Sequence, residues 1–533
     1  MKYTILRRLF LLVMAYSLAH CARKGTPTGG SKDSLPPVFV KAIPAMESTN
    51  FQAEKIKIYF DEYIKLKELR KNLVISPPQQ YEPVIVPMGT ASKYISIKIL
   101  DTLENNTTYA FNFGNSVVDN NEGNALGNFS YVFATGDHLD SLHISGSVTD
   151  PMLKTLGEGV DVMLYKYDSL YTDSIIYSQK PRYIANTLDS TLYNLTHLKE
   201  GKYLLIALKD ANNNKTYDPK TDKIGFVNDT VELPGANNFD FSLFKEVPDF
   251  RTLKPKEVLR GHLIFGYEGN AEGLEIDLLS ATPKTFKSAL IFDEETDTIH
   301  YWYSPFQTDS LNFEVRNDDY REAFTVRTRS SKIDSLKIQS SGSTLHLTDT
   351  FAIVSNTPIV QFDKRLISVT NLQDSIPVPF EARISKNRER LLILFEKSYD
   401  TPYRCTLLDD ALTDIYTLAN DSISYKTRTK SPEDYGTLIL NFSGNYQGGL
   451  IVELLDKKEE LVQKQYLEKP ESTQINLLKP GTYFVRLTFD ENGNGLWDTG
   501  SFLARKQAEK VLYIDRPIEL RANWELSELL SLD

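Results

Sequence analysis

Short segments in which apolar and polar residues alternate recur along this chain of 533 residues, and they limit its fold more than any other feature. Alternation with a period of two gives a strand one apolar and one polar face, so each strand covers a core on one side. Helices are expected only as short pieces such as residues 63–73, which contain no Pro or Gly. The sequence therefore predicts an all-β chain of about five tandem antiparallel β-sandwich domains. The clearest strand candidates are residues 55–60, 94–99, 108–113, 129–134, 261–267, 299–303 and 323–328.

The composition agrees with this prediction and excludes several classes of protein. Tyr (29) and Phe (27) are abundant whereas Met (6) and Cys (2) are scarce, which favours strands over helical bundles. A hydrophobic content of 41% supplies enough apolar residues for cores, so global disorder is excluded. The net charge of −11 argues against a dedicated nucleic-acid binder, because neutralising phosphates requires concentrated Lys and Arg.

The N-terminus has the pattern of an export signal. An apolar stretch at residues 9–18 is too short to span a bilayer as a stable helix, and it follows three cations, Lys2, Arg7 and Arg8. Residues 1–20 are therefore predicted to be a signal peptide. Residues 21–34 are small and polar, which predicts a tether.

Cys21 follows this signal in the sequence Leu18-Ala19-His20-Cys21, which resembles the bacterial lipobox, although His20 stands where a small residue is usual. The resemblance implies that Cys21 carries a lipid and becomes the mature N-terminus. The alternative is an ordinary signal peptide that leaves Cys21 as a chance thiol. If Cys21 is acylated, Cys405 has no partner for a disulfide, and we expect it to be a small buried hydrophobic residue.

Eight short motifs follow one another between residues 35 and 138. They are Pro36-Pro37, Ile43-Pro44, Phe60-Asp61-Glu62, Val74-Ile75-Ser76-Pro77, Thr108-Tyr109, Val118-Asp119, Gly123-Asn124 and Phe133-Ala134-Thr135-Gly136. Together they resemble the bacterial Ig-like domain first described in S-layer proteins. The resemblance implies a seven-stranded sandwich that serves as a spacer or adhesion module without catalytic residues. With its signal, tether and β-modules, the whole chain is also similar to a common lipoprotein of Bacteroidota.

One segment of the chain recurs near the C-terminus. Residues 198–203 (Leu-Lys-Glu-Gly-Lys-Tyr) and 478–483 (Leu-Lys-Pro-Gly-Thr-Tyr) each enter a strand and then an Asp/Asn loop with the same spacing. Residues 141–246 and 431–533 are therefore predicted to be domains of one fold. The Gly-x-Tyr entry into a strand resembles transthyretin-like or carboxypeptidase-regulatory-like sandwiches.

Two further domains are expected between these repeats. Residues 255–346 are predicted to form a β-sandwich. Residues 347–430 are a candidate second Ig-like sandwich, because residues 358–363 resemble residues 58–61.

The loops of the two repeats carry side-chain oxygens at the first, third, fifth and ninth positions, as calcium loops do. Weak calcium binding is one interpretation. The other is a turn rich in Asx and Gly, because Thr221 and Ser501 stand at the twelfth position, where an EF-hand has a carboxylate, and Lys215 replaces a usual Gly. The candidate ligands are Asp210, Asn212, Asn214, Asp218, Asp490, Asn492, Asn494 and Asp498.

No catalytic motif is found in the sequence. The seven His residues are scattered, and there is no His-Glu-x-x-His, no Gly-x-Ser-x-Gly elbow and no phosphate-binding loop. Repeated Asp-Ser and Asp-Thr pairs, as in residues 140–142 and 297–299, resemble the O-glycosylation signal of exported Bacteroidota proteins. The same pairs also suit turns that precede strands.

We therefore expect a non-enzymatic structural or binding lipoprotein of the bacterial cell envelope, whose sandwiches act as spacer or docking modules. Its expected partners are the membrane, through the N-terminal lipid, and an envelope protein or glycan. The residues after Cys21 are small and basic and do not form the acidic run that resembles a surface-export tag, and this difference implies the periplasmic face of the outer membrane.

Two other functions stay open at this point. The chain could be a carbohydrate-binding protein with Tyr301, Trp302 and Tyr303 as a platform, or a glycan hydrolase whose carboxylates meet only in space. Alternation places Trp302 on the opposite face of a strand from Tyr301 and Tyr303, so at least one side is expected to pack in a core.

Overall fold

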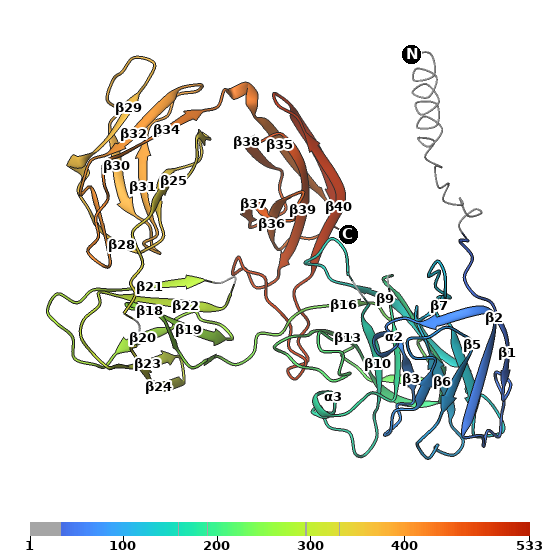
Figure 1. The fold of residues 1–533 in the computed structure, drawn as a ribbon. Helices are drawn as coiled ribbons and strands as arrows, with labels where there is room; N and C mark the ends of the chain where they lie inside the picture. The colour runs from blue at the N-terminus through green and yellow to red at the C-terminus, as the bar shows by residue number, and fades with distance from the viewer. Residues whose placement is uncertain (1–32, 158, 189, 294–295, 330, 533) are drawn as a thin grey trace, which may run out of the picture. The chain divides into compact units, whose positions relative to one another are not determined.

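The computed structural model describes residues 33–157, 159–188, 190–293, 296–329 and 331–532. This part contains 41 strands, so the all-β prediction is confirmed (Figure 1). The expected signal peptide and Cys21 lie outside the described residues. No described helix has both the length and the apolar character needed to cross a membrane.

Two sheets pack face to face in the first part of the chain, with orders β1-β2-β5-β4, to which β7 adds beside β2, and β3-β6-β8. The strands predicted at 55–60, 94–99, 108–113 and 129–134 are confirmed as β2, β5, β6 and β8. The strands are β1 (Phe39–Ile43), β2 (Lys55–Leu66), β3 (Val74–Ser76), β4 (Val84–Val86), β5 (Ser92–Lys98), β6 (Thr108–Asn112), β7 (Val117–Asp119) and β8 (Ser130–Ala134).

The helix expected at residues 63–73 is wrong in most of its extent. Strand β2 continues to Leu66, because Ile64 and Leu66 keep the alternation and pair with Asp119 and Val117 of β7. Only one helical turn follows. The short helices of the described residues are α2 (Leu69–Asn72), α3 (Ile175–Ser178), η1 (Lys364–Leu366) and η2 (Pro432–Asp434).

The second stretch of the chain, residues 142–246, and the last, residues 431–532, have the same strand order. Sheets β11-β10-β13-β14 and β12-β9-β16 correspond to β37-β36-β39-β40 and β38-β35-β41. In each stretch the final strand closes the smaller sheet by parallel pairing, β16 with β9 and β41 with β35.

The strands of the second stretch are β9 (Leu142–Thr149), β10 (Asp161–Lys166), β11 (Tyr183–Asn186), β12 (Leu192–Leu198), β13 (Gly201–Lys209), β14 (Lys223–Phe226), β15 (Val231–Leu233) and β16 (Phe241–Ser242). Those of the last are β35 (Gly436–Ser443), β36 (Gly449–Asp456), β37 (Leu461–Leu467), β38 (Thr473–Leu478), β39 (Gly481–Asp490), β40 (Val511–Leu520) and β41 (Glu525–Ser531).

The third stretch pairs sheet β17-β19-β22-β21, with β18 beside β19, and sheet β20-β23-β24. The strands predicted at 261–267, 299–303 and 323–328 are confirmed as β19, β22 and β24. The strands are β17 (Arg251–Thr252), β18 (Lys256–Leu259), β19 (His262–Glu268), β20 (Glu275–Leu278), β21 (Ser288–Asp293), β22 (Thr298–Tyr303), β23 (Ser310–Asn317) and β24 (Tyr320–Arg327).

The fourth stretch has sheets β25-β27-β31-β30, β26-β34-β32-β29 and β28-β33. It begins before the limit expected at residue 346, because Ile338 and Leu345 pack into its core. The strands are β25 (Ile338–Ser340), β26 (Thr344–Leu345), β27 (Phe351–Ser355), β28 (Ile359–Phe362), β29 (Ile367–Asn371), β30 (Phe380–Ile384), β31 (Arg390–Phe395), β32 (Pro402–Leu407), β33 (Leu412–Asp414) and β34 (Ile423–Thr429).

The chain divides into two compact units. The first runs up to Ser141 and includes His197–Lys199, and the second comprises Leu142–Thr196 and the chain from Glu200 onward. The second and the last stretches therefore lie in the same unit, which bears on the loops described next.

Candidate functional site in the two Asp/Asn loops

The two Asp/Asn loops follow central strands of equivalent sheets. Strand β13 lies between β10 and β14 and leads to Asp210, and β39 lies between β36 and β40 and ends at Asp490. Residues 203–208 of β13 are all buried, so both faces of this strand are covered. Each loop thus starts from a fixed point in a core.

Two carboxylates hold the backbone of the first loop. Asp210 accepts the N–H groups of Asn212 at 3.1 Å and Lys215 at 2.7 Å. Asp222 is fully buried and accepts the N–H groups of Ala211 at 3.0 Å and Asp218 at 2.8 Å. Because loop N–H groups have no strand partner, these carboxylates satisfy donors that would otherwise destabilise the fold.

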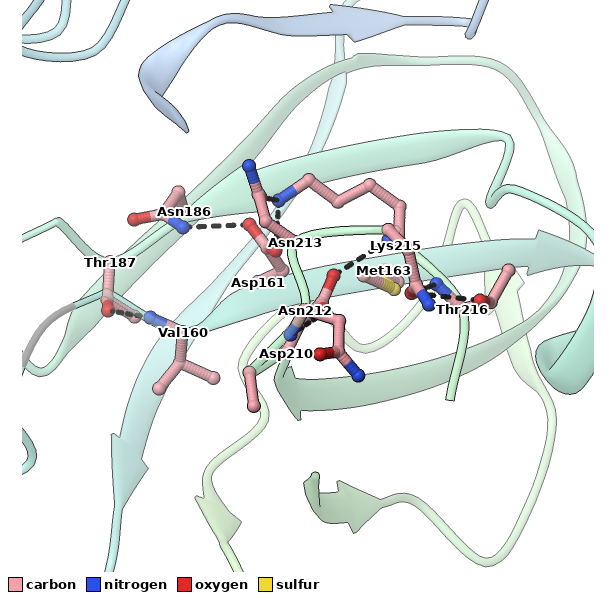
Figure 2. A network of polar contacts seen from close by, with 12 residues as sticks. Val160, Asp161, Met163, Asn186, Thr187, Asp210, Asn212, Asn213, Lys215 and Thr216 are labelled. Carbon is pink, nitrogen blue, oxygen red and sulfur yellow. Dashed lines mark hydrogen bonds and ion pairs between the residues drawn. The ribbon is translucent and has the colours of Figure 1, made fainter. Parts of the chain in front are cut away.

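Lys215 places a cation inside the first loop (Figure 2). Its Nζ lies 2.6 Å from Asp161 Oδ2 and 2.5 Å from Asn213 Oδ1. The Asn186 amide donates to the other oxygen of Asp161 at 2.7 Å. Burial raises the pKa of the Asp161 carboxyl, and the Lys215 ammonium opposes this rise. The ammonium therefore compensates the one buried carboxylate of β10 that faces the loop.

The second loop repeats the backbone arrangement without that lysine. Asp490 accepts the N–H groups of Gly493 and Gly495, both at 2.7 Å. Glu509 takes the part of Asp222, since it accepts the N–H groups of Glu491 at 2.9 Å and Asp498 at 3.0 Å. The two loops therefore share a backbone design in which an aspartate opens the loop and a carboxylate closes it.

The predicted calcium ligands are brought together in the second loop and separated in the first. The amides of Asn492 and Asn494 both donate to Asp498 Oδ2. In the first loop, Asn214 instead accepts from Thr216 at 2.8 Å and Asp218 accepts from Lys220 at 3.0 Å. Within the described residues, no group of three or more His, Cys, Asp or Glu side chains is arranged to hold a metal ion. Calcium binding stays a prediction, and the second loop is the better candidate for it.

Where the first loop has residues 219–221, the second loop has a longer segment, residues 499–508, which we call the insert. Asp222 follows Asp218 by four residues, whereas Glu509 follows Asp498 by eleven. Phe502 of the insert is fully buried, and it lies in the core of the second stretch rather than in that of its own sheets. Its ring meets the ring of Phe226 at a right angle, with centroids 5.4 Å apart.

Polar contacts fix this insert on the second stretch. The backbone N–H of Phe502 donates to Glu246 Oε1 at 2.7 Å, and Glu246 Oε2 accepts from the Tyr217 hydroxyl at 2.6 Å. Arg505 forms an ion pair with Asp173, and its guanidinium lies 4.4 Å from the centre of the Phe502 ring. A side chain at Gly500 would clash with Phe244, so only glycine fits there. The second and the last stretches are therefore held together by side chains distant in sequence.

The sequence alone did not predict the contact between Phe502 and the second stretch. The signal was the different length of the two loops, together with Phe502 and Leu503 in an otherwise polar segment. The residues next to Phe502 do not indicate which core it packs in, because its hydrogen-bond partner Glu246 is 256 residues away in the sequence.

The aromatic platform considered for carbohydrate binding does not exist in the structure. Tyr301, Trp302 and Tyr303 are 3%, 6% and 1% exposed, so both faces of this strand pack in cores. Trp302 stacks on His262 with 3.7 Å between ring centroids, and burial followed by the charge of His300 lowers the pKa of His262 to about 4. A neutral His262 is thus part of the packing.

Cys405 is a buried residue, as expected. It is 2% exposed on β32, and burial raises the pKa of its thiol to about 12. A thiol with such a pKa stays protonated and is a poor nucleophile.

Lys215→Met should destabilise the second stretch strongly, because it leaves the buried Asp161 carboxylate without its cation. We expect a loss of about 3 kcal/mol in the free energy of unfolding at neutral pH, measured from hydrogen exchange of β10 and β13. Because burial raises the pKa of Asp161, its contribution to stability is lost as pH rises through that raised pKa; the loss caused by Lys215→Met should therefore start to shrink as pH falls through the raised pKa and should be smallest below the ordinary carboxyl pKa of about 4. Lys202→Met, which removes an exposed partner of Glu232, is the matched control and should cost less than about 1 kcal/mol.

Calcium should raise the melting temperature if the second loop binds it. A free calcium concentration about tenfold above the Kd of the loop for calcium should stabilise the folded state by about 1.4 kcal/mol. Asp498→Asn should remove the effect, whereas Asp218→Asn in the first loop should not. Identical melting curves in calcium and in chelator would show that both loops are turns only.

Phe502→Ala should destabilise the second stretch although the substitution lies in the last one. Removal of a buried phenylalanine ring costs about 3–5 kcal/mol, so protection from hydrogen exchange should fall in β13 and β14. The neighbouring Leu503 is 60% exposed, and Leu503→Ala is expected to leave this protection unchanged. Equal exchange in both variants would mean that the insert does not hold the two stretches together in solution.

Comparisons with known proteins give structural likenesses of low TM-score. The major pilin subunit BcpA of Bacillus cereus is 12% identical over 73% of this chain and 98% of its own, with a TM-score of 0.14. The S-layer protein SbsC is 11% identical over 86% of this chain and 66% of its own, with a TM-score of 0.14. A titin I-band fragment, I67–I69, is 11% identical over 53% and 98% of the two chains, with a TM-score of 0.12. TM-scores this low carry no argument about function.

No curated protein matches the chain. One part of it does match a family: residues 33–135 are similar to the bacterial Ig-like domain, which confirms the Ig-like module expected at 35–138.

Proposed function

We propose that this protein is a non-enzymatic lipoprotein of the bacterial cell envelope, similar to lipoproteins of Bacteroidota, in which β-sandwiches act as spacer and docking modules. Cys21 carries the lipid, and the chain faces the periplasm from the outer membrane. The match of residues 33–135 to the bacterial Ig-like domain supports a structural module next to the anchor.

The observation that carries this proposal is the burial of Phe502 in the second stretch. A spacer has to hold its modules in a defined arrangement, and tandem domains on free linkers do not. The insert supplies a buried aromatic ring, an ion pair from Arg505 and a hydrogen bond from Gln507 to the Phe226 carbonyl at 3.0 Å. These contacts stiffen the chain far more than sequential linkers would.

Four buried carboxylates of the described residues support a structural rather than a catalytic role for these groups. Asp119, Asp222, Asp414 and Asp490 are each at most 2% exposed. Each accepts backbone N–H groups of its own loop, which leaves its oxygens engaged in holding the backbone. A retaining or inverting hydrolase needs two carboxylates that face a substrate instead.

Lipid attachment is tested by replacing its acceptor. In cells fed an alkyne fatty acid, the native chain should be labelled and Cys21→Ser should not be. Cys405→Ser is the matched control and should retain full labelling, because Cys405 is buried. Labelling of Cys21→Ser would refute the anchor, and degradation of the anchored chain by protease added to intact cells would refute the periplasmic orientation.

A further inference from the structure

The outward face of the sheet β1-β2-β5-β4 is basic, in a protein whose net charge is −11. Strand β2 points Lys55, Lys57 and Tyr59 outward, because Ile56, Ile58 and Phe60 are buried between them. In the register with β5, Lys55 lies opposite Lys98 and Tyr59 opposite Tyr94. Lys41 of β1 lies opposite Tyr59 on the same face. We call Lys41, Lys55, Lys57 and Lys98 the lysine face.

Among the described residues, the lysine face has no ion-pair partner. None of the ion pairs in the described part of the chain includes any of these four lysines. Like charges directly opposite each other on neighbouring strands, as at Lys55 and Lys98, destabilise a sheet. The acidic residues of β2, Asp61 and Glu62, lie farther along the strand, where Asp119 and Glu122 approach Glu62. The repulsion between Lys55 and Lys98 is therefore not relieved by an ion pair within the described residues.

Tyrosine rings lie among these lysines. The Lys41 ammonium is 5.4 Å from the centre of the Tyr59 ring, and that of Lys57 is 5.2 Å from Tyr94. The two rings are in contact, with centroids 5.6 Å apart. Tyrosine has an apolar ring with a polar hydroxyl, and lysine has an apolar stem with a charged end. Side chains of this kind suit the boundary between lipid headgroups and water.

Apolar side chains border the lysine face on the β4 side. Tyr81, Val84, Val86 and Met88 are 59%, 50%, 41% and 73% exposed. Val84 lies opposite Lys98 in the sheet, so the border is continuous with the lysines. A surface with cations in the middle and apolar side chains at its edge suits an interface that is anionic and partly apolar.

We propose that the lysine face docks on the anionic headgroups of the membrane that holds the Cys21 lipid. The inference rests on the proposed function for its location, since Cys21 supplies the nearby membrane. Seventeen residues lie between Cys21 and Phe39, a contour length of up to roughly 60 Å, so the first sandwich reaches the headgroups. An acyl chain combined with a basic patch holds a protein to a membrane more firmly than either alone.

A second copy of the chain fits this face less well. Two lysine faces related by a twofold axis would bring like charges together, since such an interface uses the same patch on both copies. A soluble acidic glycan would engage the lysines but gives no place to the apolar border at Val84, Val86 and Met88. A membrane surface satisfies both parts of the patch.

Vesicle binding of the full chain with Cys21→Ser tests the docking separately from the anchor. This chain should bind vesicles of phosphatidylcholine mixed with phosphatidylglycerol, release them as salt is raised, and ignore phosphatidylcholine alone. Changing the four lysines to Gln should weaken binding, by about fivefold per lysine at low salt. The melting temperature of the quadruple Gln variant should stay about the same as that of the parent, because the lost repulsion between Lys55 and Lys98 offsets the two lost contacts between lysine and tyrosine.

The matched control changes four exposed lysines elsewhere, Lys386, Lys426, Lys457 and Lys464, to Gln and keeps the same net charge. It should bind anionic vesicles like the parent. Equal weakening in both quadruple variants would overturn the proposal in favour of general attraction, and so would binding to a soluble acidic glycan without binding to vesicles. Loss of fatty-acid labelling in Cys21→Ser concerns only the anchor, so the two proposals fail independently.

Discussion

Buried carboxylates that accept backbone N–H groups are the interaction on which the loops of this protein depend. Strands of two to twelve residues leave many loop N–H groups without a sheet partner. Asp119 accepts four of them, and these bonds hold the pKa of its carboxyl below the usual value although burial works to raise it. Asp414 accepts from Tyr416 and Leu418, but there burial raises the pKa. In both cases several donors meet the buried carboxyl group.

The two Asp/Asn loops show how one such design serves two purposes. The third and fifth residues after the opening aspartate have left-handed backbones in both loops, as Asn213 and Lys215 in one and Gly493 and Gly495 in the other. Lysine at this position provides the cation for Asp161. Glycine leaves the second loop without a cation, and the longer path to Glu509 provides the insert instead. A shared backbone thus supports an internal ion pair in one loop and a contact with another sandwich in the other.

The sequence predicted features that depend on neighbouring residues, and it missed contacts between residues far apart in the chain. Alternation located β2, β5, β6 and β8 because side-chain direction in a strand depends only on neighbouring residues. The same rule, applied past residue 62, would have extended β2 to Leu66 instead of predicting a helix. The two loops were found from their spacing, whereas the partners of Lys215 and Phe502 come from other strands, Asp161 on β10 and Phe226 on β14. The lysine face likewise needed the register of β2 against β5.

The contact through the insert gives the chain a shortcut for mechanical load. Tension between a point in residues 142–246 and the C-terminus has two routes: along the covalent chain through the third and fourth stretches, or across Phe502, Arg505 and their partners. While the contacts of the insert are intact, they carry the tension, and little of it acts on the sandwiches of the third and fourth stretches. The contact of Phe502 is therefore the first to yield under such tension, and the length of the bypassed third and fourth stretches sets how much chain is released when it does.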